Sequence, residues 1–162
     1  SNAAGICWAN RLLGRDVWTY CIVGDGECEE GQVWEACIAA ATQKLDRFIV
    51  FVDWNKKQID AATDVMLSPV NFEERFRAFG FSSETVPGYD TEAIWHAVQR
   101  AKACPGRPHR IVLDTYKGIG VSFAEEQEFN HYLSFGPEKG EEGVAEIERR
   151  YSQGCYPGGA RI

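Results

Sequence analysis

Two polar turns, each close after a strongly apolar run, hold the residues best suited to chemistry. Gly24, Asp25 and Gly26 follow the run VWTYCIV, and Asn55 comes two residues after the run FIVFVD. Carboxylate and amide oxygens suit a hard, octahedral cation such as Mg²⁺. Glycines let backbone N–H groups approach a phosphate group closely. The turns are therefore a candidate site for a cation and a phosphate, and the alternative, two ordinary polar turns, stays open.

Four apolar runs are predicted to be strands, with helical patterns between them. The strands are expected over residues 17–23, 48–53, 81–86 and 110–116, and the helices over 4–13, 29–44, 70–79, 91–103 and 138–150. Wholly apolar strands that alternate with helices indicate an α/β fold, a parallel sheet with helices on both faces. One intervening helix makes the first two strands parallel neighbours. Asp25 and Asn55 should then meet at the carboxyl edge of the sheet, where such folds bind ligands.

The common nucleotide and calcium motifs are incomplete. Residues 26–31 read G-x-x-x-x-G, but the Lys of a phosphate-binding P-loop does not follow. Neither G-x-G turn of the chain has the third glycine of a dinucleotide fingerprint. Residues 53–64 have the length of an EF-hand loop, but Gln58 stands where that loop needs glycine. The sequence therefore disfavours these three kinds of site.

The composition favours one globular domain with no nucleic-acid or membrane partner. The 162 residues carry 24 acidic and 17 basic side chains, a net charge of −7, which lacks the basic footprint of a nucleic-acid binder. No apolar run is long enough to span a membrane and no secretory leader opens the chain, so we expect a cytoplasmic protein. The six cysteines form no CxxC pair and are predicted to be buried, reduced thiols. His96 and His109 are expected on the surface.

The wider pattern of motifs resembles a known enzyme family. The segment from Gly24 to Ala36, together with Asp53-Trp54-Asn55, is similar to the metal and diphosphate motif of thiamine-diphosphate enzymes. The runs QID at 58–60 and KGIGVSF at 117–123 resemble transketolases, in particular those with a separate N-terminal subunit. On this resemblance residues 4–151 form a thiamine-diphosphate-binding domain truncated at its N-terminus. Residues 1–3 read as an expression scar and residues 152–162 as a tail.

The resemblance implies a role for several residues in holding the cofactor. Asp25 and Asn55 would ligate Mg²⁺ (or Ca²⁺) through their side chains, and Lys57 through its backbone carbonyl. Gly24 and Gly26 would bind the diphosphate of thiamine diphosphate. Ile59 would make an apolar contact near the cofactor.

The resemblance also implies three catalytic candidates. Glu30 falls at the family's interface glutamate, which acts on the cofactor bound to the facing subunit. Lys117 and His131 fall at a lysine and a histidine near the diphosphate and the substrate. The family usually has Trp before that histidine, where this chain has Asn130. The alternatives are a solvated loop histidine, a surface lysine, and a glutamate that only faces a helix dipole.

The implied function is that of a transketolase, which moves a two-carbon ketol unit between sugar phosphates in pentose-phosphate carbohydrate metabolism. Such an enzyme is a dimer or hetero-oligomer and needs a pyrimidine-binding C-terminal subunit or domain. No candidate for that domain is found here, so we expect the chain alone to be inactive. Two alternatives are another thiamine-diphosphate enzyme (a 1-deoxyxylulose-phosphate synthase or a 2-oxoacid dehydrogenase E1 subunit) and a non-catalytic α/β binding module.

Overall fold

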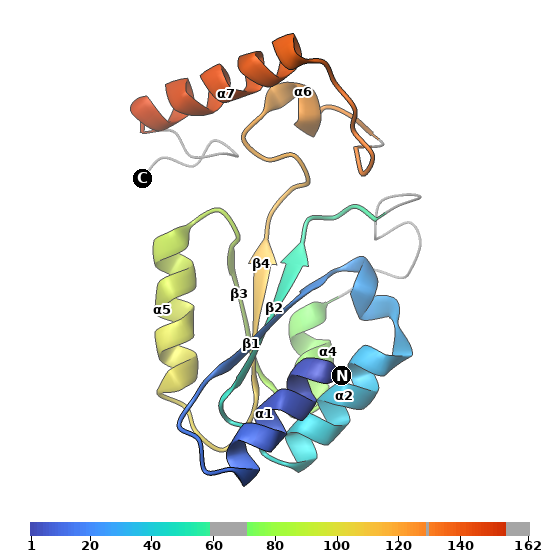
Figure 1. The fold of residues 1–162 in the computed structure, drawn as a ribbon, viewed down its shortest axis with the longest axis vertical. Helices are drawn as coiled ribbons and strands as arrows, with labels where there is room; N and C mark the ends of the chain where they lie inside the picture. Colours follow the sequence, from blue (N-terminus) through green and yellow to red (C-terminus); the bar gives the residue numbers. More distant parts are fainter. Residues whose placement is uncertain (59–70, 129, 155–162) are drawn as a thin grey trace.

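One parallel sheet forms the centre of the molecule (Figure 1). The computed structural model describes residues 1–58, 71–128 and 130–154. Within these residues the sheet has four strands in the order β1-β2-β4-β3, and all neighbouring strands are parallel. Their bounds are β1 (Thr19–Gly24), β2 (Phe48–Trp54), β3 (Ser82–Pro87) and β4 (His109–Asp114). The predicted parallel sheet is confirmed, with strand ends shifted by one or two residues.

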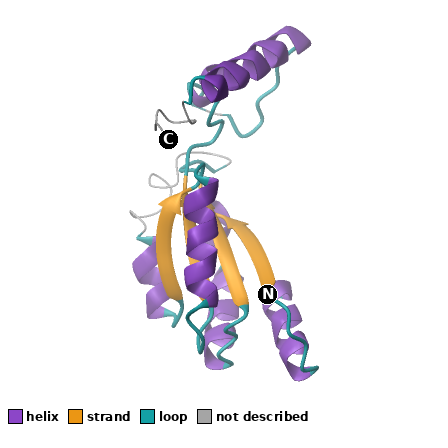
Figure 2. Ribbon diagram, turned by 90° about the vertical axis from the view of Figure 1, so that its left-hand side faces the viewer, coloured by secondary structure: helices purple, strands orange, loops and turns teal. Residues whose placement is uncertain are grey.

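Helices cover both faces of the sheet, as the sequence predicts (Figures 1 and 2). One face packs against α1 (Asn2–Leu12), α2 (Gly31–Thr42) and α4 (Phe72–Ala78), and the other against α5 (Thr91–Lys102). Side-chain caps explain where two of these helices begin. Asn71 accepts a hydrogen bond from Glu74 N at 3.2 Å, and Asp90 accepts one from Ala93 N at 2.9 Å.

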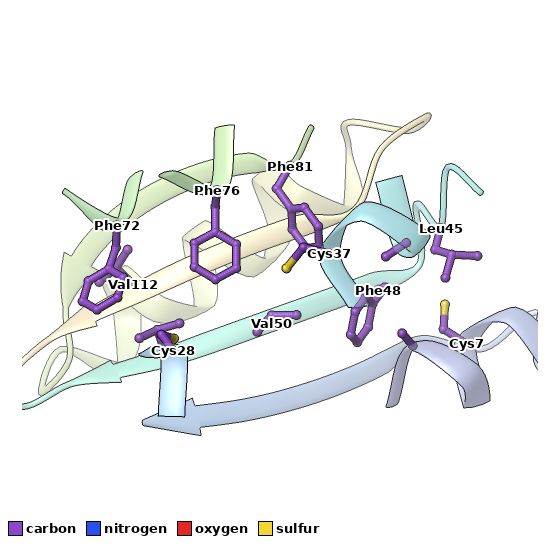
Figure 3. Close-up of a cluster of buried hydrophobic side chains, with 13 residues drawn as sticks. Cys7, Cys28, Cys37, Leu45, Phe48, Val50, Phe72, Phe76, Phe81 and Val112 are labelled. Carbon is purple, nitrogen blue, oxygen red and sulfur yellow. The ribbon is translucent and has the colours of Figure 1, made fainter. Parts of the chain in front are cut away.

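The larger hydrophobic cluster lies under α2 and α4 (Figure 3). Phe72, Phe76 and Phe81 pack against Val50 and Val112 of the two central strands. Burying one Phe side chain contributes roughly 1.5–3 kcal/mol. This cluster therefore holds the strands in register and sets the positions of the turns at their carboxyl ends.

Helix α2 begins later than predicted. Residues Gly26–Glu29 form a short 3₁₀ turn (η1), and Glu30 is extended with φ −72° and ψ 126°. The regular helix therefore starts at Gly31 rather than at residue 29. The polar residues 26–29 that precede this helix belong to the turn after β1.

Two predictions of surface or core position are wrong. His109, expected on the surface, is the first residue of β4 and is 1% exposed, because β4 lies between β2 and β3 inside the sheet. Cys7, Cys28 and Cys37 are buried as predicted, but Cys21 is only half-buried and Cys104 is exposed in the turn after α5. Cys155 lies outside the described residues.

The chain beyond β4 extends past the carboxyl edge of the sheet (Figure 1). It contains α6 (Ser122–Glu125) and α7 (Pro137–Ser152). Ser122 N donates to Glu146 Oε2 at 2.9 Å, and Arg150 Nη2 donates to Ser122 Oγ at 2.8 Å. In the described residues no helix is both long and apolar enough to cross a membrane.

Candidate functional site

The turns after β1 and β2 lie side by side. Gly24 pairs with Asp53 in the parallel ladder, and Asp25 N donates to Asp53 O at 3.1 Å. The structure therefore brings the Gly24-Asp25-Gly26 turn next to the Asp53–Asn55 turn, as the sequence predicts. This juxtaposition follows from the parallel pairing of two consecutive strands.

Asp25 is a buried carboxylate in a fixed orientation. The residue is only 2% exposed. Oδ1 accepts a hydrogen bond from Gly26 N at 2.9 Å, and Oδ2 accepts one from Lys56 N at 2.9 Å. Two backbone donors from two different turns thus hold the carboxylate, one on each oxygen.

Asn55 presents its amide from the neighbouring turn. Nδ2 donates to Asp53 Oδ2 at 2.8 Å, and Oδ1 accepts from Lys57 N at 3.1 Å. The predicted ligand set is then one carboxylate, one amide oxygen and one backbone carbonyl. These are hard oxygen donors, which fit Mg²⁺ or Ca²⁺ rather than a metal that prefers thiolate or imidazole. In the part of the chain that the structure describes, no group of three or more His, Cys, Asp or Glu suits a metal, so other oxygen atoms would have to complete this one.

The glycine turn already holds an anionic group. Gly24 N donates to Glu27 Oε2 at 2.6 Å, so the Glu27 carboxylate occupies the N–H that was predicted from the sequence to bind a diphosphate. A Cβ on Gly26 would lie 3.2 Å from both Cβ and Oε1 of Gln58. The turn therefore suits an anion and leaves little room for a larger residue at position 26.

A lysine and a histidine meet beyond the end of β4. Lys117 Nζ lies 2.8 Å from His131 Nδ1. Asn130 is buried beside them, and its Nδ2 donates to Lys117 O at 3.0 Å and to Ala124 O at 2.7 Å. The residue that departs from the family pattern thus fastens the histidine segment to the lysine turn. Lys117 N also donates to Asn55 O at 3.3 Å, which places this pair beside the candidate metal turn.

The predicted roles of two further site residues are untested. Glu30 is exposed at the N-cap of α2, and its side chain makes no capping hydrogen bond. Its predicted role on a facing subunit remains a prediction. Ile59 lies outside the described residues, so its contact with a cofactor is also untested.

Sequence reasoning missed Lys56. This residue has a positive φ of 69°, and its Nζ forms an ion pair with Asp114 Oδ1. Its N–H reaches Asp25, so it is part of the site without being a proposed ligand. The sequence did not point to Lys56, because a left-handed backbone conformation is expected of Gly or Asn rather than of Lys.

Comparison with known proteins identifies the class of this domain. A family model described as the thiamine diphosphate binding domain of transketolase matches residues 12–157. The crystal structure of transketolase from Campylobacter jejuni has a TM-score of 0.81 and 31% identity, covering 91% of this chain and 24% of that one. The chain thus belongs to the transketolase family and has its thiamine-diphosphate-binding fold.

Curated relatives include separate subunits. The 6-deoxy-6-sulfo-D-fructose transketolase subunit SqwG of Clostridium sp. (strain MSTE9) is 41% identical over 92% of this chain and 54% of its own length. An apulose-4-phosphate transketolase subunit from Phocaeicola vulgatus is 31% identical over 93% of this chain and 53% of its own length. The chain therefore spans about half the length of these two relatives.

Proposed function

We propose that the chain is the diphosphate- and Mg²⁺-binding half of a transketolase that transfers a two-carbon ketol unit between sugar phosphates. The observation that supports this most directly is a shared edge of the sheet. The oxygen donors of Asp25 and Asn55 and the turn at Gly26 lie beside the Lys117–His131 pair. A metal-and-phosphate site next to proton-carrying side chains suits group transfer on a phosphorylated sugar.

In this proposal the first turns hold the cofactor. The Asp25 and Asn55 side chains and the Lys57 carbonyl hold the metal. Gly24 and Gly26 offer N–H groups to the diphosphate. This requires the Glu27 carboxylate to leave Gly24 N, and the Gly26 N–H to be shared between Asp25 Oδ1 and the diphosphate. The metal neutralises the charge of the diphosphate. Thiamine diphosphate, when bound, supplies the carbanion chemistry.

The Lys117–His131 pair acts on the substrate in this proposal. The lysine ammonium has only donors, so its contact with His131 Nδ1 makes that nitrogen an acceptor. The proton of the neutral ring then lies on Nε2, which is able to donate to a substrate hydroxyl. Asn130 keeps the ring beside the lysine because it bonds the Lys117 carbonyl.

A second subunit or domain completes the site in this proposal. Two curated relatives, of which this chain covers 54% and 53%, are named as subunits, and a pyrimidine-binding partner would supply the second half of the site. Glu30, exposed at the start of α2, is the residue proposed to face that partner within a hetero- or homo-oligomer. The relatives' names include 6-deoxy-6-sulfo-D-fructose and apulose 4-phosphate, so the substrate panel should include both sugars.

The test is ketol transfer by the full-length protein assembled with its pyrimidine-binding partner. We expect transfer from a ketose phosphate to an aldose phosphate that needs both Mg²⁺ and thiamine diphosphate. Asp25→Ala should lower this activity by at least about 100-fold, because removal of a residue that only supports a metal ligand already costs about 10–100-fold. Asp16→Ala is the control, because Asp16 is an exposed carboxylate paired with Arg47, away from the site.

Three other results would contradict the proposal. Turnover of pyruvate without ketol transfer would indicate a different thiamine-diphosphate enzyme. Cofactor binding by the assembled protein with no turnover of any substrate would indicate a non-catalytic module. Full activity of the isolated chain would refute the need for a partner.

A further inference from the structure

We propose that Lys56 is a positioning residue that ties the metal-ligand turn to the segment carrying Lys117. This inference rests on the proposed function, because it assigns Lys56 to the geometry of the same site. Lys56 supplies no ligand atom in the proposed metal site. It acts through its backbone N–H on one side and its ammonium group on the other.

The backbone of Lys56 is held in an unusual conformation that serves Asp25. Its φ of 69° lies in the left-handed region, which residues with a Cβ seldom adopt. In this conformation its N–H donates to Asp25 Oδ2 at 2.9 Å. The backbone of Lys56 thus adopts an unfavourable φ angle, and in that conformation its N–H donates a hydrogen bond to the buried Asp25 carboxylate.

The side chain of Lys56 reaches the end of β4. Its Nζ forms an ion pair with Asp114 Oδ1 and donates to Thr115 O at 3.2 Å. The same ammonium lies 4.1 Å from the centre of the Trp54 ring and 4.8 Å from that of Tyr116. One charged group therefore contacts the last residue of β2, the last residue of β4 and the two residues after it.

Backbone hydrogen bonds extend the same connection toward Lys117. Thr115 N donates to Trp54 O at 3.2 Å, and Lys117 N donates to Asn55 O at 3.3 Å. The two turns are thus also joined by two backbone hydrogen bonds. A shift of the Lys56 side chain would move its own backbone N–H, and with it the orientation of Asp25. We therefore expect loss of the ammonium to weaken metal binding although no ligand is removed.

The experiment is a double-mutant cycle on the full-length protein assembled with its partner. The variants are Lys56→Met, Asp114→Asn and the double variant, with Lys56→Arg as the conservative replacement. The probe is Mn²⁺ in the presence of thiamine diphosphate, titrated by electron paramagnetic resonance. We expect each single variant to weaken Mn²⁺ binding by about 10-fold, within the range seen when a residue supporting a metal ligand is removed. The double variant should be no weaker than either single one, and Lys56→Arg should restore most of the affinity.

The matched control is Lys44→Met. Lys44 also has a positive φ, of 48°, but it follows α2 at the amino-terminal end of the sheet. The same substitution there should leave Mn²⁺ affinity unchanged. Thermal unfolding of each variant without metal or cofactor separates a loss of affinity from a loss of stability.

Each outcome bears on one of the two proposals. Wild-type protein that binds no Mn²⁺ with thiamine diphosphate overturns the proposed function itself. Wild-type protein that binds Mn²⁺, with Lys56→Met binding it equally well, overturns only the role of Lys56. Additive losses in the double variant also overturn it, because the ammonium and Asp114 would then act independently.

Discussion

Lys117 Nζ and His131 Nδ1 lie 2.8 Å apart, although 14 positions separate them in the chain. The contact depends on two features of the intervening segment. Gly118 has φ 86°, and a Cβ there would lie 2.9 Å from the backbone carbonyl carbon of Ala124. Asn130 then bonds both Lys117 O and Ala124 O, which closes the segment onto itself. The pair is therefore held by a compact turn rather than by two independent loops.

Removing either member of this pair should lower ketol transfer without weakening metal binding. We expect Lys117→Met and His131→Ala each to reduce kcat/KM by about 100-fold, at the lower end of what a positioned proton-transfer group contributes. The double variant should lose little more than the worse single variant, because the two side chains act as a unit. Steady-state kinetics on the assembled enzyme, with Mn²⁺ affinity measured in parallel, checks this. His96→Ala is the control, since His96 is exposed on α5.

The buried histidine His109 should make the fold sensitive to mild acid. Burial lowers the pKa of its imidazole, and the nearby Asp46 carboxylate opposes this only in part. In the unfolded chain the ring takes up its proton near pH 6.5, before the folded protein does. The stability contribution is therefore complete above pH 6.5 and is lost as the pH falls toward the lower folded pKa, with a slope of at most about 1.4 kcal/mol per pH unit.

Urea unfolding at pH 8.0, 6.5 and 5.5 measures this effect. His109→Leu should show a shallower pH dependence than the wild type, whereas His96→Leu should not. Equal slopes for wild type and His109→Leu would mean that other groups account for the acid sensitivity.

Replacing the buried arginine Arg110 should stabilise the protein. The residue is 1% exposed, and its guanidinium lies 4.1 Å from the centre of the Phe76 ring. Nη1 donates to Ser83 Oγ at 3.2 Å, but Nε and Nη2 make no hydrogen bond to any described residue. Burial lowers its pKa to about 10. Arg110→Met keeps most of the volume and removes this desolvated charge, so we expect a gain of about 1–3 kcal/mol.

Thermal unfolding provides the measurement for Arg110. A gain of this size should raise Tm by on the order of 5 °C in a chain of this length. Arg100→Met is the matched control, because Arg100 is an exposed arginine on α5 that pairs with Glu84, and its loss should change stability by no more than about 0.5 kcal/mol. A lower Tm for Arg110→Met would show that its contacts with Ser83 and the Phe rings outweigh its desolvation.

The attachment of α7 should weaken in strong acid. Hydrogen bonds from the Ser122 hydroxyl and N–H, followed by the contact with Arg150, lower the pKa of Glu146 to about 2. Because the pKa of Glu146 is lower in the folded protein than its usual value of 4.5, the carboxylate stabilises the attachment fully at pH values above 4.5. This contribution is lost as the pH falls toward 2. Hydrogen exchange of the α7 amides at pH 6, 4 and 3 should show faster exchange at the lowest pH, after correction for the intrinsic rate. Glu146→Gln should have fast exchange at all three values, and a wild type with unchanged protection at pH 3 would contradict the assignment.

The sequence alone determined the sheet and the meeting of Asp25 with Asn55. Wholly apolar strands must be covered on both faces, and consecutive strands joined by one helix pair in parallel, so their carboxyl ends lie together. The sequence also predicted where a helix begins when a capping residue marks its start, as Asp90 does for α5. These features depend on local patterns and on a general rule of topology.

The remaining features depend on how distant segments of the chain pack together. His109 and Arg110 look like the polar start of a strand, but β4 lies between two other strands, so both are buried. Lys56 is held in its left-handed conformation because its N–H donates to Asp25 and its ammonium pairs with Asp114. Both partners are far from Lys56 in the sequence. Strand order and long-range pairing set these positions, and neither is encoded in the type of the residue or of its neighbours.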